Sequence, residues 1–547
     1  MRIKLPSGKW IEANEQQIEA LILMKGWLDG SAQPTNLQGN KNLFCLQGFA
    51  GTGKTTMVKE LVDWFNNGIG RWQKEITVTA PTHTAKKEIS NATGLKGRTI
   101  QGLCGLAPDI DVTDFDINNP AFALKNKPTA HLCSVIILDE ASMLNTDLFD
   151  LLLQQTVGVK VLFMCDSAQL PPVNEEISPV IISEEIGFRY SLTKVERQAG
   201  DNPIMPTYDS IRNDIGSSTD QFEHKTSLLR VPNVEGGEDE VGIEFIKELN
   251  TFGNRVVRAF ASKEFEQDPR YCKLFCWTNK QVEFWNNEIR KVLILKRRKE
   301  VAAIDPEDVE STLHDSTAMP NELLVGYKNY TDGLVNSAQY RIIQIAYDTE
   351  SMDYGDFVNN SPLEGRKFMV DIAVYRVILE EITEKTQIAC CIIENNPENY
   401  AQFLLAHNYY HSLGVEKRWW TKYYSWKEQY MLLTDIRSKA NKVIVKKDLD
   451  YGYAMTVHKA QGSTYHSVFV DEDNIDRLED RPFMQYFYKE DMAKARKEKT
   501  LVEFMKKHPT FDTYFKKKQV EKNKLKYVAL SRPRMKATVL SAKTVEP

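Results

Sequence analysis

The segment QGFAGTGKTT, residues 47–56, constrains the fold of this chain more than any other feature. Its Gly48, Gly53, Lys54 and Thr55 satisfy the spacing G-x-x-x-x-G-K-S/T of a loop that binds nucleotide phosphates. The apolar run NLFCLQ before the loop predicts a buried strand, and KTTMVKELVDWF after it carries apolar residues at helical spacing. Strand, loop and helix in this order predict a parallel α/β domain whose helix N-terminus and backbone N–H groups face the phosphates.

The loop and a later pair of carboxylates predict a site for ATP and Mg²⁺. Lys54 is expected to reach the outer phosphates and the Thr55 hydroxyl to bind Mg²⁺. In VIILDEASM (135–143), an apolar strand ends in Asp139, which would hold Mg²⁺ through water, and Glu140, which would orient or deprotonate the attacking water. The remaining loop positions expected to contact ATP are Gly48, Ala50, Gly51, Thr52, Gly53 and Thr56.

Size and composition set the broad class. A chain of 547 residues should contain several domains, because single cores rarely exceed about 250–300 residues. No run approaches the roughly 18 apolar residues of a membrane helix, and no secretory signal is visible, so we expect a cytoplasmic protein without a membrane partner. The eight cysteines lack zinc spacing, which predicts neither disulfides nor a structural metal. A net charge of −5 argues against a protein that coats nucleic acid but permits a local basic groove.

The pattern of strands and helices changes along the chain. The first 205 residues alternate strand-like and helical segments, which predicts a parallel sheet with its ligands at the carboxyl ends of the strands. Residues 104–130, rich in Pro, Asn and Asp, indicate a small insert. The acidic segment VEGGEDEVG (234–242) is interpreted as a linker, and a second α/β pattern begins near residue 271. The lysine-rich segment 489–524 is expected to form solvated helices.

A β-rich region interrupts the second α/β pattern. Residues 340–394 carry segments such as YRIIQIAYDT and suggest a small barrel, followed by an aromatic, basic stretch over 401–431. Within it, KRWWTKYYSWKEQY (417–430) allows two interpretations, a projection that braces or lines a nucleic-acid channel or a helix that buries its aromatic rings against the barrel. The α/β pattern resumes near residue 442.

DEASM followed by CDSAQLPPV (165–173) resembles superfamily 1 helicases of the RecD/Dda-like branch, although Cys165 stands where that family usually has glycine. The resemblance covers nearly the whole chain. It implies Gln169 beside the γ-phosphate, and it implies that Arg197 in LTKVERQ and Arg532 in YVALSRPR stabilise charge on the transferring phosphoryl group. Further nucleotide contacts implied by the resemblance are Gln17, Gln461 and Gly462, the first through the adenine edge.

The same resemblance implies a path for single-stranded DNA. TAPTHTAKK (79–87), RTIQGL (98–103), WTNKQVEFWN (277–286) and YAMTVHKAQGSTY (453–465) are similar to the family's DNA-contacting motifs. In the insert, Phe122 or Phe115 is expected to act as a wedge that stacks on the terminal base pair. The DNA-binding residues implied in the four motifs are Pro81, Thr82, His83, Thr99, Thr278, Asn279, Thr456 and His458.

The resemblance implies two RecA-like motor domains with an insert in each. It also implies an ATP-dependent DNA helicase that moves 5′ to 3′ on single-stranded DNA, acts at single/double-strand junctions and works as a monomer, with replication or recombination proteins as partners. The expected boundaries are 1–103 and 131–215 for the first motor domain, 104–130 for a hairpin pin, 216–325 and 441–547 for the second motor domain, and 326–440 for an SH3-like barrel with its projection.

Three alternatives remain open at this point. An RNA or RNA–DNA helicase of the same superfamily would share the motifs. A kinase or nucleotide switch would use the same phosphate loop but leaves CDSAQLPPV and TVHKAQGSTY without a role. A non-catalytic clamp for nucleic acid has no need of Lys54, Asp139 and Glu140 together. ATP hydrolysis measured with and without single-stranded DNA distinguishes the motor from the last two.

Overall fold

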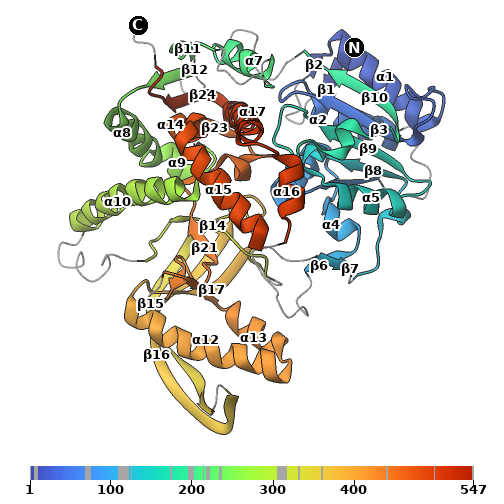
Figure 1. Ribbon diagram of the computed structural model, residues 1–547. Helices are drawn as coiled ribbons and strands as arrows, with labels where there is room; N and C mark the ends of the chain where they lie inside the picture. The colour runs from blue at the N-terminus through green and yellow to red at the C-terminus, as the bar shows by residue number, and fades with distance from the viewer. Residues whose placement is uncertain are drawn as a thin grey trace.

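Three six-stranded sheets organise the computed structural model (Figure 1). The predicted α/β fold with two largely parallel sheets is confirmed, and a third, mainly antiparallel sheet accompanies them. The structure describes residues 2–4, 10–67, 76–108, 122–124, 126–172, 175–194, 202–213, 215–216, 222–232, 237–304, 317–330, 333–358, 361–438, 441–497 and 499–544.

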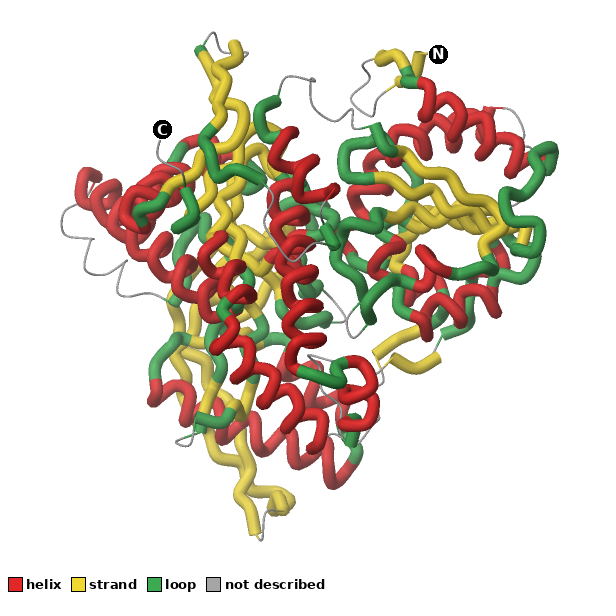
Figure 2. Tube along the Cα trace, turned by 45° about the horizontal axis from the view of Figure 1, so that its top comes forward, coloured by secondary structure: helices red, strands yellow, loops and turns green. Residues whose placement is uncertain are grey.

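The first sheet has the order β10-β3-β9-β8-β4-β5, and all of its neighbouring strands are parallel. Helices cover both faces, as Figure 2 shows. Both faces of β3 are therefore buried, which explains why its sequence is a continuous apolar run. Its strands are β3 (Asn40–Gly48), β4 (Ile76–Ala80), β5 (Arg98–Thr99), β8 (Val135–Leu138), β9 (Lys160–Cys165) and β10 (Ile186–Leu192).

Alternate residues of β3 pack against different helices. Phe44 and Leu46 join the core beneath α1 and α2, whereas Leu43 and Cys45 join the core beneath α4 and α5. This alternation fixes the register of the strand that leads into the phosphate loop. The helical elements of this half are α1 (Glu15–Asp29), α2 (Lys54–Asn67), α3 (His83–Thr93), α4 (Ile100–Leu103), η1 (Ala130–Leu132), η2 (Ala141–Met143), α5 (Thr146–Gln155) and α6 (Pro179–Ile182). The next helix, α7 (Met205–Asn213), packs instead into the core beneath the second sheet, through Tyr208 and Ile211.

Two small hairpins accompany the first sheet. β1 (Arg2–Lys4) pairs with β2 (Trp10–Glu12), and β6 (Leu106–Pro108) pairs antiparallel with β7 (Phe122–Leu124). The second pair lies within the predicted insert 104–130. Phe115 and the side chain of Phe122 lie outside the described residues, so the wedge remains a prediction.

The second sheet has the order β11-β12-β24-β23-β13-β22 and is parallel except at the β11 edge. The linker interpretation of residues 234–242 is wrong for residues 238–242, because they belong to β12 and are paired with β11. The elements are β11 (Ser227–Pro232), β12 (Glu238–Ile246), α8 (Leu249–Phe260), α9 (Lys263–Gln267), β13 (Cys272–Cys276), α10 (Asn279–Ile304), β22 (Ala454–Thr456), η3 (Val457–Ala460), β23 (Tyr465–Asp471) and β24 (Pro533–Leu540).

The third sheet is built around two long paired strands and runs from Leu323 to Tyr451, beyond both ends of the predicted insert 326–440. Its order is β18-β17-β16-β15-β14-β21, with edges at β18 and β21, so a closed barrel is not confirmed within the described residues. The elements are β14 (Leu323–Gly326), β15 (Gln339–Val358), β16 (Ser361–Glu381), β17 (Gln387–Ile393), α12 (Pro397–Lys417), α13 (Trp420–Lys427), β18 (Tyr430–Met431), β19 (Ile436–Arg437), β20 (Val443–Val445) and β21 (Leu449–Tyr451).

Each of the two interpretations of the aromatic stretch 417–430 applies to a different tryptophan. Trp426 is buried and stacks on Tyr410 of α12 with ring centroids 4.7 Å apart, inside a core shared with the third sheet. Trp419 remains 48% exposed. Burial against the sheet therefore accounts for Trp426, and Trp419 is the aromatic residue of this pair left for an external contact.

The segment 489–524 is helical, as predicted, but it is not simply a solvated surface. α17 forms part of the core of the second half, and Lys522 is fully buried in an ion pair with Glu479. A buried ammonium is stable only when paired, which is why this lysine-rich helix can pack inward. The helical elements here are α14 (Glu472–Asp476), η4 (Arg477–Glu479), α15 (Arg481–Lys497), α16 (Leu501–Lys507) and α17 (Phe511–Leu530).

Two chemical features of the described chain bear on function. No described helix combines the length and apolar character needed to cross a bilayer. All eight cysteines carry free thiols, and seven of them are buried.

Candidate functional site

The phosphate loop connects β3 to α2 and depends on its glycines. Gly51 and Gly53 adopt φ values of 85° and 89°, which side chains other than glycine disfavour. A Cβ atom on Gly53 would lie 2.7 Å from Gln17 Nε2, and one on Gly48 would lie 2.6 Å from Thr52 Oγ1. The Lys54 ammonium donates to the carbonyls of Gly48 and Phe49, the latter at 3.1 Å, and so lies over the loop. Thr55 and Thr56 follow in the first turn of α2.

Asp139 and Glu140 directly follow the carboxyl end of β8, and β9 alone separates β8 from β3, the strand that leads into the phosphate loop. The Glu140 N–H donates to Asp139 Oδ1 at 2.9 Å, and Glu140 itself has the left-handed φ of 51°. Burial and the Glu140 carboxylate raise the pKa of Asp139 to about 7, while the Lys54 ammonium acts in the opposite direction. A divalent cation would favour the charged carboxylate further, so this chemistry fits Mg²⁺.

The segment after β9 adds Asp166 and Gln169. Asp166 Oδ1 accepts from Ala168 N at 3.0 Å, which fixes the turn that carries Gln169. Gln169 is 5% exposed, and within the described residues its Oε1 has no hydrogen-bond partner. A buried amide oxygen of this kind is available to a ligand. Cys165, in place of the usual glycine, points into the core, where its Sγ lies 3.5 Å from Cys45 Sγ.

Gln17 contacts the phosphate loop but is used within the protein. Its Nε2 donates to the Thr52 carbonyl at 3.1 Å, and its Oε1 accepts from Asn14 N in the capping box of α1. Its role in reading adenine remains a prediction. Sequence reasoning missed the adjacent Gln16, whose Oε1 accepts from the backbone N–H groups of Thr193 and Lys194. This contact links α1 to the segment leading to Arg197, which lies outside the described residues.

At the phosphate loop, one tyrosine joins the first half of the molecule, built on the first sheet, to the second half, built on the second sheet. The hydroxyl of Tyr527, on α17, donates to Asp166 Oδ2 at 2.8 Å and accepts from Ala50 N at 3.2 Å. The same hydroxyl lies 2.9 Å from the hydroxyl of Tyr208 on α7. The rings of the two tyrosines stack, with centroids 4.9 Å apart. Burial raises the pKa of Tyr527 well above its ordinary value, so the hydroxyl retains the proton that it donates to Asp166.

Tyr527 and Asp166 were not among the predicted site residues. The sequence places Tyr527 in an apolar helical segment, where a core role is the usual interpretation of tyrosine. The available signal was position, because Tyr527 opens YVALSRPR and Asp166 opens the turn before Gln169.

Arg532 is buried and oriented into the second half. Its Nε donates to the Val528 carbonyl at 3.1 Å, its Nη2 to the Ser531 hydroxyl at 2.9 Å, and its Nη1 to the Ser463 carbonyl at 3.4 Å. No contact between its guanidinium and the phosphate loop occurs among the described residues. Its predicted role at the phosphoryl group therefore requires the side chain to turn, and it remains a prediction.

The segment that contains Gln461 and Gly462 crosses to the first half. Gly462 has a φ of 76°, and a Cβ atom there would lie 3.0 Å from the Cβ of Ala85 on α3. Gln461 is 6% exposed, and its Nε2 finds no hydrogen-bond partner in the described part of the chain. The amide donor of Gln461 is thus available to a ligand, and the nucleotide contact of Gln461 and Gly462 remains a prediction.

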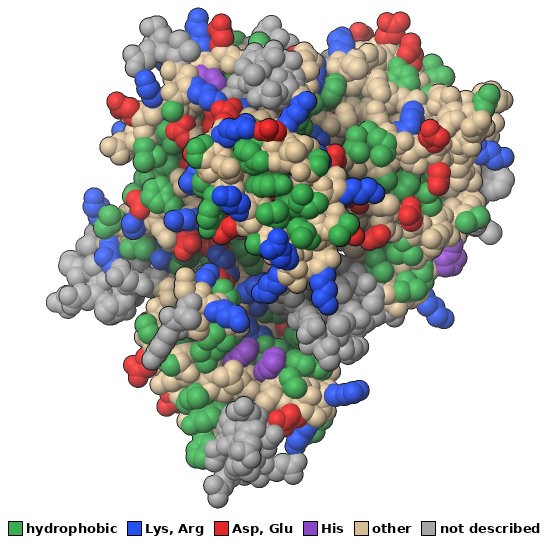
Figure 3. Space-filling view, in the orientation of Figure 1, with side chains coloured by type: hydrophobic (Ala, Val, Ile, Leu, Met, Phe, Trp, Pro, Cys, Tyr) green, Lys and Arg blue, Asp and Glu red, His purple; other side chains and the backbone are tan. Residues whose placement is uncertain are grey.

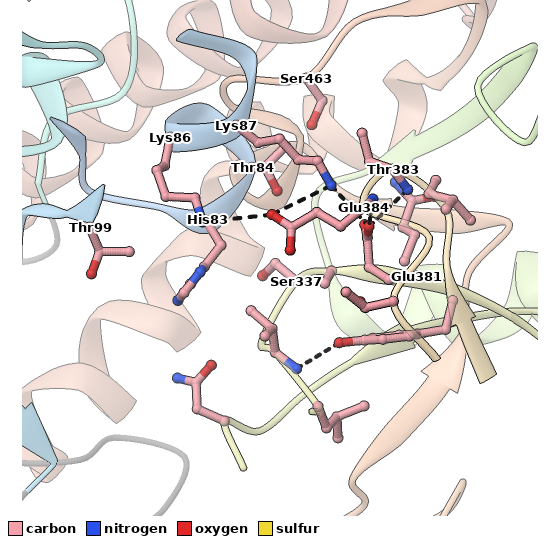
Figure 4. A pocket seen from close by; sticks show the side chains of 18 of the residues that line it. His83, Thr84, Lys86, Lys87, Thr99, Ser337, Glu381, Thr383, Glu384 and Ser463 are labelled. Atoms are coloured by element: carbon pink, nitrogen blue, oxygen red, sulfur yellow. Dashed lines mark hydrogen bonds and ion pairs between the residues drawn. The ribbon is translucent and has the colours of Figure 1, made fainter. Parts of the chain in front are cut away.

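A groove of about 660 Å³ runs between the first half, the third sheet and the segment after Gly462. Figure 3 shows Lys and Arg side chains gathered around the hollow in this central region. Of the predicted DNA-binding residues, Pro81, His83 and Thr99 line it together, and the close view in Figure 4 shows His83 and Thr99 on the same side. Thr82 instead caps α3, its Oγ1 accepting from Ala85 N at 3.1 Å.

The other four predicted DNA contacts lie outside this lining. Thr278 lies near Thr456, because β13 and β22 are neighbouring parallel strands in which Cys276 is opposite Thr456. Thr278 caps α10 and interacts with Asn474, whose Oδ1 accepts from Thr278 N at 3.0 Å. Asn279 and His458 are exposed, and Thr456 is buried. The structure thus gathers the predicted contacts at two places rather than one.

Comparison with known proteins agrees with these observations. A family model described as an AAA domain matches residues 32–228. The ATP-dependent DNA helicase Dda of enterobacteria phage T4 is 27% identical over 263 residues, which cover 47% of this chain and 53% of Dda. The ATP-dependent RecD2 DNA helicase of Deinococcus radiodurans is 31% identical over 182 residues, which cover 33% of this chain and 23% of RecD2.

Among solved structures, the Pif1 helicase of Candida albicans aligns over 98% of this chain and 96% of its own, with 16% identity and a TM-score of 0.43. The sequence matches to Dda and RecD2 span about half and a quarter of those relatives. The phosphate loop, the carboxylate pair and Gln169 all lie within residues 32–228, which the family model covers. The chain is therefore similar in sequence to the DNA helicases Dda and RecD2, and the resemblance carried by its motifs is confirmed.

Proposed function

We propose that this chain is an ATP-dependent DNA helicase that moves 5′ to 3′ on single-stranded DNA and separates the duplex ahead. The observation that carries the proposal is the dual contact of Ser463. Ser463 lines the groove together with Pro81, His83 and Thr99, and its carbonyl accepts a hydrogen bond from Arg532. If Arg532 turns toward the phosphoryl group when ATP binds, this bond to Ser463 would break, and the change would reach the wall of the strand path.

The site residues fit ATP and Mg²⁺. The glycine cradle, the Lys54 ammonium and the carboxylates of Asp139 and Glu140 would hold them, and ATP would supply the free energy of phosphoryl transfer to water. Tyr527 bonds to the phosphate loop and to Asp166, so loop movement is coupled to α17. Gly462, packed against Ala85 of α3, forms a second joint between the halves beside the groove. Opening and closing about these joints would alternate the grip on the strand.

Strand displacement on tailed duplexes tests the proposal. We expect ATP-dependent opening of a DNA duplex with a 5′ single-stranded tail and little opening of one with a 3′ tail. Preference for the 3′ tail would contradict the polarity, and preference for the RNA versions of the substrates would favour the RNA helicase alternative. ATP hydrolysis that single-stranded DNA does not stimulate would contradict a motor altogether.

Replacing Tyr527 with phenylalanine should uncouple the two halves. The ring and its stacking on Tyr208 remain, but the hydrogen bonds of the hydroxyl to Asp166, to Ala50 N and to the Tyr208 hydroxyl are lost. We expect DNA-stimulated kcat to fall about 10-fold or more, equivalent to about 1.4 kcal/mol, with KM for ATP nearly unchanged. Tyr514→Phe is the matched control, because Tyr514 is buried on the same helix and donates to Asp491 within the second half. Equal losses in both variants would show that Tyr527 only stabilises α17.

A further inference from the structure

The groove contains as many carboxylates as cations. Its lining holds three cationic side chains, Lys86, Lys87 and Arg270, and three acidic ones, Glu88, Glu381 and Glu384. All three cations are paired with these acids. A path for a polyanionic strand requires uncompensated positive charge, because phosphate binding is driven by neutralisation and counterion release. The pairs must therefore break before the cations can serve phosphates.

The pairs span parts of the chain that are far apart in sequence. Lys87, on α3, lies 2.9 Å from Glu381 at the end of β16 and 3.7 Å from Glu384 in the turn that follows. Lys86 lies 3.8 Å from Glu384. Figure 4 shows these side chains meeting across the groove, beside His83. We define residues 381–384 as the acidic turn; it belongs to the third sheet, whereas the lysines belong to the first half.

The acidic turn is held in place by its own backbone. Glu381 Oε2 accepts from Thr383 N at 2.8 Å and from Glu384 N, so its carboxylate is fixed toward Lys87. Arg270, in the second half, donates to the Thr383 hydroxyl at 3.0 Å and lies 3.5 Å from Glu88 of α3. All three parts of the molecule therefore meet at this turn.

We propose that Lys86 and Lys87 bind phosphates of the single strand, and that the acidic turn occupies them until a strand enters. This inference rests on the proposed function, since it assigns the groove to single-stranded nucleic acid. Strand phosphates replace the Glu381 and Glu384 carboxylates on the lysines, and the contact between α3 and the third sheet is released. The ion pairs are partly exposed, with Lys87 and Glu381 side chains 14% and 12% accessible, so exchange with a phosphate does not require unfolding.

Binding of a fluorescein-labelled oligothymidylate, followed by anisotropy over a range of NaCl concentrations, tests this exchange. Glu381→Gln/Glu384→Gln should bind about 3-fold or more tightly at low salt, because the lysines no longer have a competing partner. Glutamine keeps the oxygen that accepts from the turn backbone. Lys86→Ala/Lys87→Ala should weaken binding and reduce the slope of log affinity against log salt by about 1.4, the value for two single-strand phosphates.

A variant that combines the two glutamine and the two alanine substitutions distinguishes competition for the lysines from a general effect of negative charge near the groove. If the acidic turn acts through the lysines, the glutamine substitutions should have no effect in the Lys86→Ala/Lys87→Ala background. An equal gain in both backgrounds would overturn the proposal, since any lost negative charge near the groove would then suffice. Glu380→Gln is the matched control, because Glu380 precedes the turn and pairs with Lys385 on the same hairpin; its affinity should equal that of the wild type.

Failure of this inference is distinguishable from failure of the proposed function. A wild-type protein that does not bind the oligothymidylate contradicts the strand path itself. A wild-type protein that binds it, with glutamine variants unchanged in affinity, contradicts only the exchange at Lys86 and Lys87. Thermal melting of every variant establishes that affinities are compared between folded proteins.

Discussion

Alanine at position 54 is expected to abolish ATP turnover, lowering kcat by more than about 100-fold, or about 2.7 kcal/mol of transition-state stabilisation. The Lys54 ammonium lies over the phosphate loop, bonded to the Gly48 and Phe49 carbonyls, where it can follow charge onto the outer phosphates. Binding of single-stranded DNA should persist, because the groove is lined by other residues. Steady-state hydrolysis and oligonucleotide anisotropy measure the two effects.

Lys59→Ala is the control for Lys54→Ala. Lys59 is on the same helix but pairs with Asp63 one turn later, so the substitution removes the same charge without touching the loop. Its turnover should match the wild type. A Lys54→Ala protein that kept a third of wild-type turnover would refute the role assigned to the ammonium.

Glutamine in place of Glu140 should separate ATP binding from hydrolysis. The amide cannot accept the proton of the attacking water, so kcat should fall at least about 100-fold, while affinity for ATP changes little. Single-turnover hydrolysis and titration with a fluorescent ATP analogue test the two parts. Glu185→Gln, at an exposed position just before the edge strand β10 of the same sheet, should leave both unchanged. Undiminished hydrolysis in Glu140→Gln would require another base.

What the sequence could predict is largely what its local spacing determines. The phosphate loop, the carboxylates after β8 and the strand alternation that buries both faces of β3 each depend on residues within about two turns or one strand of each other. The glycines and acidic residues of 234–242 predict a linker. Residues 238–242 are nevertheless a strand, because they pair with β11 and because the strand they begin pairs, from Gly242 on, with β24 near the end of the chain.

Contacts between distant parts of the chain could not be predicted in this way. The bond from Tyr527 to Asp166 joins residues 361 positions apart, and Lys87 and Glu381 are 294 apart. The orientation of Arg532 is likewise set by the Ser463 carbonyl, which no motif specifies. Such contacts depend on how the sheets are placed relative to one another.

The position of β24 has a consequence for the order of folding during synthesis. Residues 533–540 lie between β12 and β23 in the second sheet, although they are the last of its strands in sequence. The first sheet is complete once residue 192 has been made, whereas β12 must wait for nearly three hundred residues before its parallel neighbour appears. Pairing so distant in sequence is slow to form, so the unpaired edge of β12 is exposed to aggregation in the nascent chain while about half of the protein is still being made.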